Sequence, residues 1–144
     1  MVKLTVSKIS PDEKNMPQVK IYGLNLNIEK NRLSISRAIH EAMMSALNYP
    51  AEKKFHRFIL LSKENFIYPD DRSEKYTIIE ISMFEGRSVE VKKSLIRELY
   101  SNLETQCEIS PQDIEITIFE SPIHNWGIRG VPADELQLGY KVEV

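Results

Sequence analysis

The stretch YTIIEISMFEGRSVEVKKSLIRELYSNLETQC, residues 76–107, predicts a strand, a tight turn and a helix in direct succession. Its first nine residues are rich in β-branched side chains, which favour strands. From Val91 to Cys107 apolar residues recur every four positions, as in an amphipathic helix, and Ser88 stands where an N-cap is expected. A further strand-like run, DIEITIF, follows at 113–119. This part of the chain therefore predicts a β-α-β unit.

The first half of the chain shows the same order of elements. VKIYGL at 19–24 is typical of a strand, residues 28–47 of a helix, and FHRFILL at 55–61 of a second strand. The apolar positions of this helix follow the 3.6-residue period: Leu33, Ile35, Ala38, Ile39, Ala42, Met43, Ala46 and Leu47. The sequence thus predicts two β-α-β units.

The two halves also resemble each other in sequence, faintly in residue identity but consistently in the spacing of their elements. A shift of 60 positions pairs Pro17 with Thr77, Ile21 with Ile81 and Arg37 with Arg97, and a shift of 61 pairs Pro50 with Pro111. We interpret this as an α+β fold with a duplicated unit of about sixty residues, both helices lying on one face of a four-stranded sheet. A ferredoxin-like domain has the same element order, so the order alone leaves both folds open.

The composition is typical of a globular domain. Of 144 residues, 42% are hydrophobic and 28% charged, and the formal net charge of -2 argues against a nucleic-acid or membrane-surface role. The single cysteine, Cys107, excludes an internal disulfide, suits a reducing compartment, and is expected to be a small buried core residue. No apolar stretch approaches the ~20 residues of a membrane span. The three histidines lack ligand-type spacing. We therefore expect a cytoplasmic domain without metal or cofactor.

Three segments lie outside the repeat. Residues 63–76 predict a loop or a short hairpin. SPIHNWGIRGVPADE at 121–135 contains the only tryptophan, and LQLGYKVEV at 136–144 alternates like a final strand, which would pair with another subunit. We expect residues 1–16 to be an extension and 17–144 to be the domain, with a tail at 121–144 that mediates assembly.

The turn EGRS, at 85–88, is the first candidate for chemistry. Gly86 permits a tight turn, and Arg87 then lies where the strand ends and the helix begins. An arginine beside free backbone N–H groups makes a natural carboxylate site, although a solvated loop arginine would look the same in sequence.

Together these features resemble the tautomerase superfamily, which includes 4-oxalocrotonate tautomerase, malonate semialdehyde decarboxylase and macrophage migration inhibitory factor. The resemblance runs from Pro17 to about Val144 and rests on five stretches: PQVKIYGL, IHEAMMSALNYPAEKKF, DDRSEKYTIIEISMFEGRSVEVKKSLIRELY, ISPQDIEITIFE and HNWGIRG. It favours the tautomerase fold, with short C-terminal strands, over the ferredoxin-like one. It also implies a homotrimer.

The resemblance implies a base that is an N-terminal proline acting on enol and keto acids. By position, Pro17 matches the catalytic proline and Arg87 a substrate-binding arginine, and Arg72 falls where relatives of the decarboxylase carry an arginine. Trp126 and Ile128 match the apolar wall of the pocket. Arg129 could help to bind the substrate carboxylate, and His124 is a candidate substrate-binding residue of the tail.

Three departures from the family bear on this activity. Lys53 stands where the decarboxylase has an acidic residue, and Glu85 where it has a second arginine, so we do not expect that decarboxylation. If residues 1–16 stay attached, Pro17 carries a tertiary amide without a basic nitrogen. Met16 could instead be a translation start, which would leave Pro17 as the first residue.

Three hypotheses follow from the sequence. The first is an isomerase of small keto or enol carboxylates, with Pro17 as general base and Arg87 as carboxylate anchor. The second is a non-catalytic oligomer of the same fold, in which Pro17 is an internal proline that heads a strand and the protein binds an anion or a protein partner. The third is a ferredoxin-like ligand-binding domain.

Overall fold

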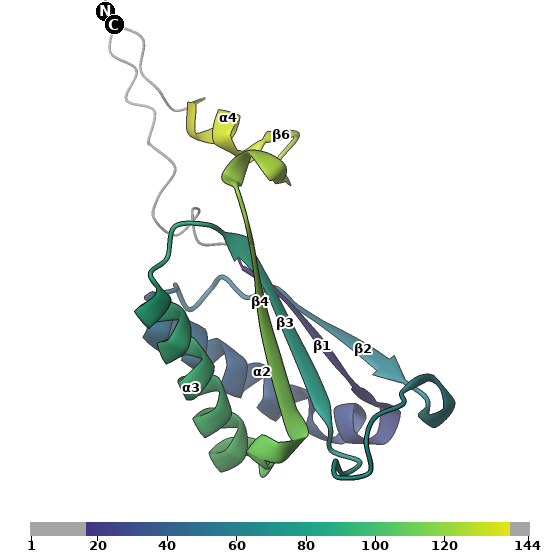
Figure 1. The fold of residues 1–144 in the computed structure, drawn as a ribbon. Coiled ribbons are helices and arrows are strands. Elements are labelled where there is room, and N and C mark those ends of the chain that lie inside the picture. The colour runs from purple at the N-terminus through teal and green to yellow at the C-terminus, as the bar shows by residue number, and fades with distance from the viewer. Residues whose placement is uncertain (1–16, 139–144) are drawn as a thin grey trace, which may run out of the picture.

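The computed structural model describes residues 17–138, and both predicted β-α-β units are present (Figure 1). The first unit consists of β1 (Gln18–Leu24), α2 (Asn25–Leu47) and β2 (His56–Leu61). The second consists of β3 (Thr77–Phe84), α3 (Val89–Cys107) and β4 (Ile114–Ser121). The predictions about residues 1–16 lie outside the described residues.

The four strands form one sheet in the order β2-β1-β3-β4. Strands within each unit are parallel, and the two units join through the antiparallel pair β1–β3. Helices α2 and α3 lie side by side on one face of the sheet, as predicted (Figure 1). Because β1 and β3 run in opposite directions, an approximate two-fold axis relates the units, and each strand begins where the other ends.

The C-terminal ends of α2 and α3 show the same correspondence between the two units. Asn48 follows α2 with φ 56°, and Glu108 follows α3 with φ 55°. Both residues adopt the left-handed conformation that terminates many helices, and they lie 60 positions apart in the sequence. The shift read from sequence identities is therefore also a structural repeat.

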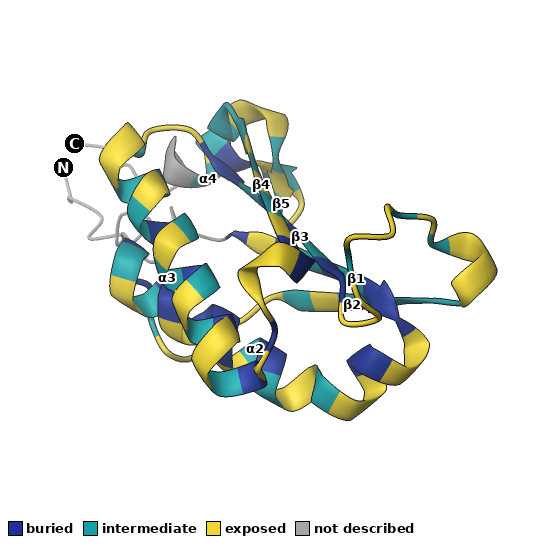
Figure 2. Cartoon of the chain, turned by 60° about the horizontal axis from the view of Figure 1, so that its bottom comes forward, coloured by how far each residue is buried: buried dark blue, intermediate teal, exposed yellow. Residues whose placement is uncertain are grey.

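The core lies between the sheet and the helices, and both helices carry bands of buried and exposed positions (Figure 2). The predicted stripe of α3 is confirmed, since Leu95, Leu99, Leu103 and Cys107 are all buried. The stripe of α2 is correct apart from Leu33, which is 79% exposed. Leu33 stands two positions before the buried Ile35, and residues two apart in a helix face opposite sides. This helix also begins three residues before the predicted start.

The remaining segments were predicted less well. The connector at 63–76 is a loop with a single 3₁₀ turn, η1 (Lys63–Asn65). In the tail, β5 (Gly127–Ile128) and β6 (Val131–Pro132) form a small hairpin, which supplies the predicted short C-terminal strands. The strand predicted at 136–144 is wrong at its start, because α4 (Ala133–Leu138) includes residues 136–138; residues 139–144 lie outside the described part. No helix in the described range, 17–138, is long and apolar enough to span a membrane.

Candidate active site

Pro17 is buried immediately before β1, at the end of the sheet where β3 and β4 finish (Figure 1). Gln18 pairs with Ser82, so the same register carried one residue further places Pro17 opposite Met83. Met83 in turn pairs with Glu120 on β4. Strands are spaced by about 4.8 Å, so the backbones of Pro17 and Glu120 lie about 10 Å apart across the sheet.

Glu120 is an acidic residue on the face of β4 that the helices cover. The alternation of the strand places it on the same side as Ile116 and Ile118, which pack against the core. Its Oε1 accepts an ion-paired hydrogen bond of 2.7 Å from Nζ of Lys92, in the first turn of α3. Its Oε2 is buried and has no hydrogen-bond partner among the residues that the structure describes. A buried oxygen without a partner is costly, so it marks a position where a ligand or a proton could be accepted.

Arg87 belongs to the turn that joins β3 to α3, at the same end of the sheet. Gly86 has φ 124°, which side-chain-bearing residues rarely adopt, and Ser88 caps the helix by accepting a 3.1 Å hydrogen bond from the N–H of Val91. The guanidinium of Arg87 is half-buried and has no hydrogen bond or ion pair with another residue of the described range. Burial lowers the pKa of Arg87, and the charge of Glu120 partly offsets that effect. Arginine remains protonated despite such shifts, so Arg87 provides a cation at this end of the sheet.

The tail is anchored beside these residues by the only tryptophan. Trp126 packs edge-on against Phe84 with ring centroids 4.8 Å apart, and its Nε1 donates a 2.8 Å hydrogen bond to Oγ of Ser121. Phe84 directly follows Met83, so this contact brings the tail to the Pro17 end. A surface hollow of about 440 Å³ is lined by residues of the same tail: His124, Asn125, Trp126, Gly127, Gly130, Val131 and Pro132.

Two further predicted residues lie on the small hairpin of the tail. Ile128 is half-buried in β5. Arg129 is exposed in the two-residue turn that follows, where Arg129 and Gly130 have φ of 52° and 90°. Positive φ at both central residues is the pattern of a tight hairpin turn.

Arg72 lies at the opposite end of the sheet, and the structure does not bring it together with Pro17 and Arg87 within the chain. It precedes β3, whereas Arg87 follows that strand. Its guanidinium pairs with Asp71 at 2.5 Å and with Glu115 at 2.7 Å, and it lies over the ring of Tyr76. These contacts raise the pKa of Arg72. They join the connector to the beginning of β4.

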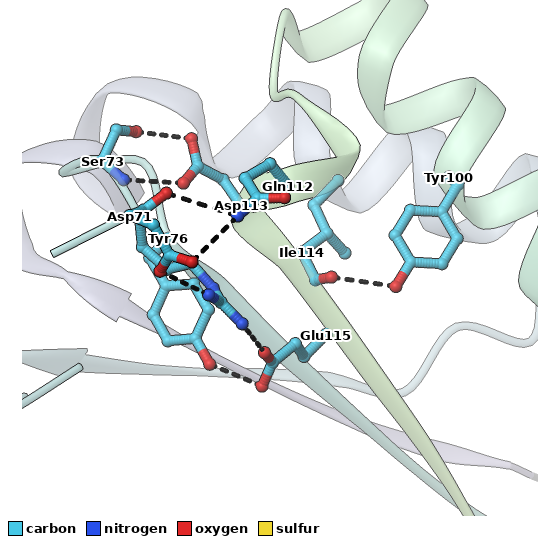
Figure 3. Close-up of polar contacts among 9 residues, drawn as sticks. Asp71, Ser73, Tyr76, Tyr100, Gln112, Asp113, Ile114 and Glu115 are labelled. Atoms are coloured by element: carbon cyan, nitrogen blue, oxygen red, sulfur yellow. Dashed lines mark hydrogen bonds and ion pairs between the residues drawn. The ribbon is translucent and has the colours of Figure 1, made fainter. Parts of the chain in front are cut away.

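Figure 3 shows the surrounding network, in which Asp113 receives hydrogen bonds from the backbone N–H and the hydroxyl of Ser73. The hydroxyl of Tyr76 donates to Glu115 at 2.6 Å. Burial, together with Glu115, raises the pKa of Tyr76 to about 12. The contacts of Arg72 thus anchor the loop at 63–76 to the start of β4.

Sequence reasoning missed Glu120 and Lys92. The signal was present, because Glu120 continues the inward alternation of Ile116 and Ile118, and a carboxylate at such a position requires a partner. Lys92 could not be identified as that partner, since its contact depends on how α3 crosses β4. Within residues 17–138 there is no cluster of three or more His, Cys, Asp and Glu side chains that could hold a metal ion.

Comparison with known proteins places this chain in a family. Residues 53–129 match the family described as "Tautomerase enzyme". The probable tautomerase YusQ of Bacillus subtilis (strain 168) is 24% identical over 116 residues, which cover 77% of this chain and 91% of that protein. The 2-hydroxymuconate tautomerase of Comamonas testosteroni is 39% identical over 57 residues, 40% of this chain and 90% of that enzyme. This shorter match is about as long as one of the repeated units.

Solved structures agree on the fold. A malonate semialdehyde decarboxylase superposes with a TM-score of 0.73 at 21% identity, over 85% of this chain and 98% of that one. A fused 4-OT described as an asymmetric trimer gives a TM-score of 0.73 at 20% identity, over 83% and 98% of the two chains. These likenesses select the tautomerase fold over the ferredoxin-like alternative. The chain therefore belongs to the tautomerase family.

Proposed function

We propose that this chain is an isomerase of small keto or enol carboxylates, and that Pro17 is its general base in the form of the chain that begins at Pro17. The observation that supports this most is the position of Pro17 in one row with Met83 and Glu120, at the end of the sheet where the turn with Arg87 follows β3. The backbones of Pro17 and Glu120 lie about 10 Å apart, with the buried Met83 between them. A free α-amine has a pKa of about 7.7–8, and burial near cations lowers it further. Such an amine is an effective base at neutral pH.

The other residues receive roles from their contacts. Arg87 binds the substrate carboxylate through its guanidinium and stabilises the enolate that develops during proton transfer. Glu120 positions Lys92, and its unpaired oxygen accepts a hydrogen bond from the substrate. Trp126 and Ile128 form the apolar wall, while Arg129 and His124 contact the substrate from the tail. Arg72 has no role in this proposal.

The second candidate is a non-catalytic oligomer of the same fold. It differs from the first in whether the nitrogen of Pro17 is free. With residues 1–16 attached, the nitrogen of Pro17 belongs to a tertiary amide and cannot accept a proton. Intact-mass measurement of the protein from its native host would reveal which form exists. A mass that corresponds to a start at Pro17 supports the isomerase, and a mass that includes residues 1–16 supports the second candidate.

The activity itself is tested with a chain prepared to begin at Pro17. The probe is 2-hydroxymuconate, the substrate in the name of a relative, and the loss of its enol absorbance is followed. We expect turnover that falls at least about a hundredfold in Pro17→Ala and in Arg87→Gln. Lys93→Gln is the matched control, because Lys93 is exposed on α3 and should leave turnover unchanged. Equal turnover by the Pro17→Ala variant would refute the proposal.

A further inference from the structure

The two-fold relation between the units gives the Pro17 end of the sheet a counterpart at the opposite end. A shift of 60 positions places Thr77 where Pro17 stands and Asn27 where Arg87 stands. At this counterpart end β1 and β2 finish and α2 begins, as the path of the chain shows (Figure 1). None of the residues assigned to the proposed reaction lies here.

A cavity of about 580 Å³ occupies this counterpart end. Its volume falls within the range of small-molecule sites, which are about 300–1,000 Å³. Its apolar lining includes Leu24, Leu26, Leu61 and Cys107. Leu26 is 81% exposed although it is a large hydrophobic residue, so an apolar ligand part would remove it from water.

The charged lining of the cavity favours an anion. Three lysines, Lys30, Lys63 and Lys75, face two acidic residues, Glu74 and Glu108. Lys75 already donates a 3.0 Å hydrogen bond to the backbone carbonyl of Glu108. Lys30 and Lys63 form no ion pair within residues 17–138, so their ammonium groups are available to a carboxylate.

The polar wall of the cavity is held in place without a ligand. Nδ2 of Asn31 donates to Oδ1 of Asn27 at 2.8 Å, and Nδ2 of Asn27 donates to Oγ1 of Thr77 at 3.4 Å. Thr77 is fully buried, and its hydroxyl donates to the carbonyl of Lys75 at 2.8 Å. The counterpart of Pro17 is thus a satisfied hydroxyl rather than an amine, and it supplies no base.

We propose that this cavity is a second, non-catalytic binding site for a small amphipathic carboxylate. The apolar part of the ligand packs against Leu24, Leu26 and Leu61, and its carboxylate pairs with Lys30 and Lys63. The site lies where the two-fold relation places the counterpart of the Pro17 end, and it supplies no base. It is independent of the proposed isomerase, because the two share no residue.

The test uses octanoate as the probe and the full chain as the protein. Isothermal titration should show binding at concentrations below about 10 mM, as expected for a ligand of this size. The neutral analogue octanamide should bind at least about tenfold more weakly, and so should octanoate to the double variant Lys30→Gln/Lys63→Gln, because each loses a charge-assisted hydrogen bond. Lys93→Gln should bind octanoate like the parent chain.

The lone cysteine reports the location of the ligand. Cys107 lines the cavity, so saturating octanoate should slow its reaction with a thiol reagent such as DTNB. Three results would overturn the proposal: no octanoate binding, equal binding of octanoate and octanamide, or an unchanged rate of Cys107 labelling. Loss of octanoate binding in Arg87→Gln would move the ligand to the Pro17 end and would also overturn it. Failure of the isomerase assay would leave all of these outcomes unaffected.

Discussion

At the scale of single residues, the candidate site combines two cations, Arg87 and Lys92, with one carboxylate, Glu120. All three residues are half-buried. We expect Arg87 and Lys92 to attract an anionic substrate, and Glu120, which holds Lys92 at 2.7 Å, to reduce that attraction. The unpaired Oε2 of Glu120 shows that this carboxylate is not simply one half of a saturated ion pair. Its charge should therefore influence both substrate binding and the proton affinity of Pro17.

Replacing this carboxylate by an amide tests that influence. Glu120→Gln removes a negative charge near the amine of Pro17, and a nearby negative charge raises the pKa of an amine. In the chain that begins at Pro17, we expect the acidic limb of the profile of kcat/KM against pH to move to lower pH, and KM for an anionic substrate to fall. Glu90→Gln, an exposed change in the same first turn of α3, is the control and should shift neither quantity. A Glu120→Gln profile that coincides with the parent profile would remove Glu120 from the site.

The sequence proposed Arg72 and Arg87 as residues of one site, but we expect their variants to have different effects. Arg72→Gln removes the ion pairs to Asp71 and Glu115, so it should lower the urea midpoint of unfolding. It should leave kcat/KM within about twofold of the parent value, since Arg72 lies at the far end of the sheet. Arg87→Gln should instead lower kcat/KM and leave the urea midpoint of unfolding close to that of the parent chain. A large loss of kcat/KM in correctly folded Arg72→Gln would mean that a neighbouring subunit brings Arg72 to the reacting substrate.

At the scale of elements, β2 is coupled to α2 through two histidines, the buried His40 and the partly buried His56. Nδ1 of His56 lies 2.9 Å from Oγ of Ser36, and its ring centroid is 6.2 Å from that of His40. Burial, and to a smaller extent the charges of His40 and Lys54, lower the pKa of His56 to about 4. The folded chain therefore keeps this histidine neutral at pH values where the unfolded chain protonates it.

This shift predicts acid destabilisation with a defined sign. Because the pKa of His56 is lower in the folded state than the usual 6.5, its contribution to stability is complete above about pH 6.5 and is lost as the pH falls toward 4. Between pH 7 and pH 5 we expect a loss of about 1–2 kcal/mol in the free energy of unfolding from this group. Urea unfolding at both pH values measures it. In His56→Gln the difference between the two pH values should shrink by that amount, and an unchanged difference would contradict the shift.

The elements also show how far the sequence could lead. Strands and helices of both units followed from local periodicity, and Ser88 was identified as a cap from its place before the helix. The prediction for the tail was wrong at 136–138, because a short amphipathic segment fits a strand and a helix equally well. The placement of Arg72 and the ion pair of Glu120 required the register of β3 with β4, which is a long-range property that no local pattern contains.

At the scale of the whole molecule, the helices cover one face of the sheet, and within residues 17–138 no helix covers the other (Figure 1). Phe119 belongs to the face opposite the inward Ile118, and it is 48% exposed. We propose that this open face is buried when the chain assembles as a homotrimer. Relatives described as fused 4-OT trimers share the fold and support the proposal.

Assembly is measured by light scattering after size exclusion. One chain has a mass of 16.7 kDa, so a trimer should give about three times that value. Phe119→Lys introduces a charge on the open face and should shift the mass toward that of a single chain, because an unpaired charge is costly to bury. Lys93→Gln should leave the trimer intact. A parent chain that elutes with the mass of a monomer would contradict this assembly.

The central claim is that activity depends on a free nitrogen at Pro17, and one comparison tests it directly. The enol-to-keto rate of 2-hydroxymuconate is measured with two preparations of the same sequence, one beginning at Pro17 and one retaining residues 1–16. We predict turnover by the first and none above background by the second, since only the first has a basic amine at the buried end of β1. Equal rates from the two preparations would contradict the account.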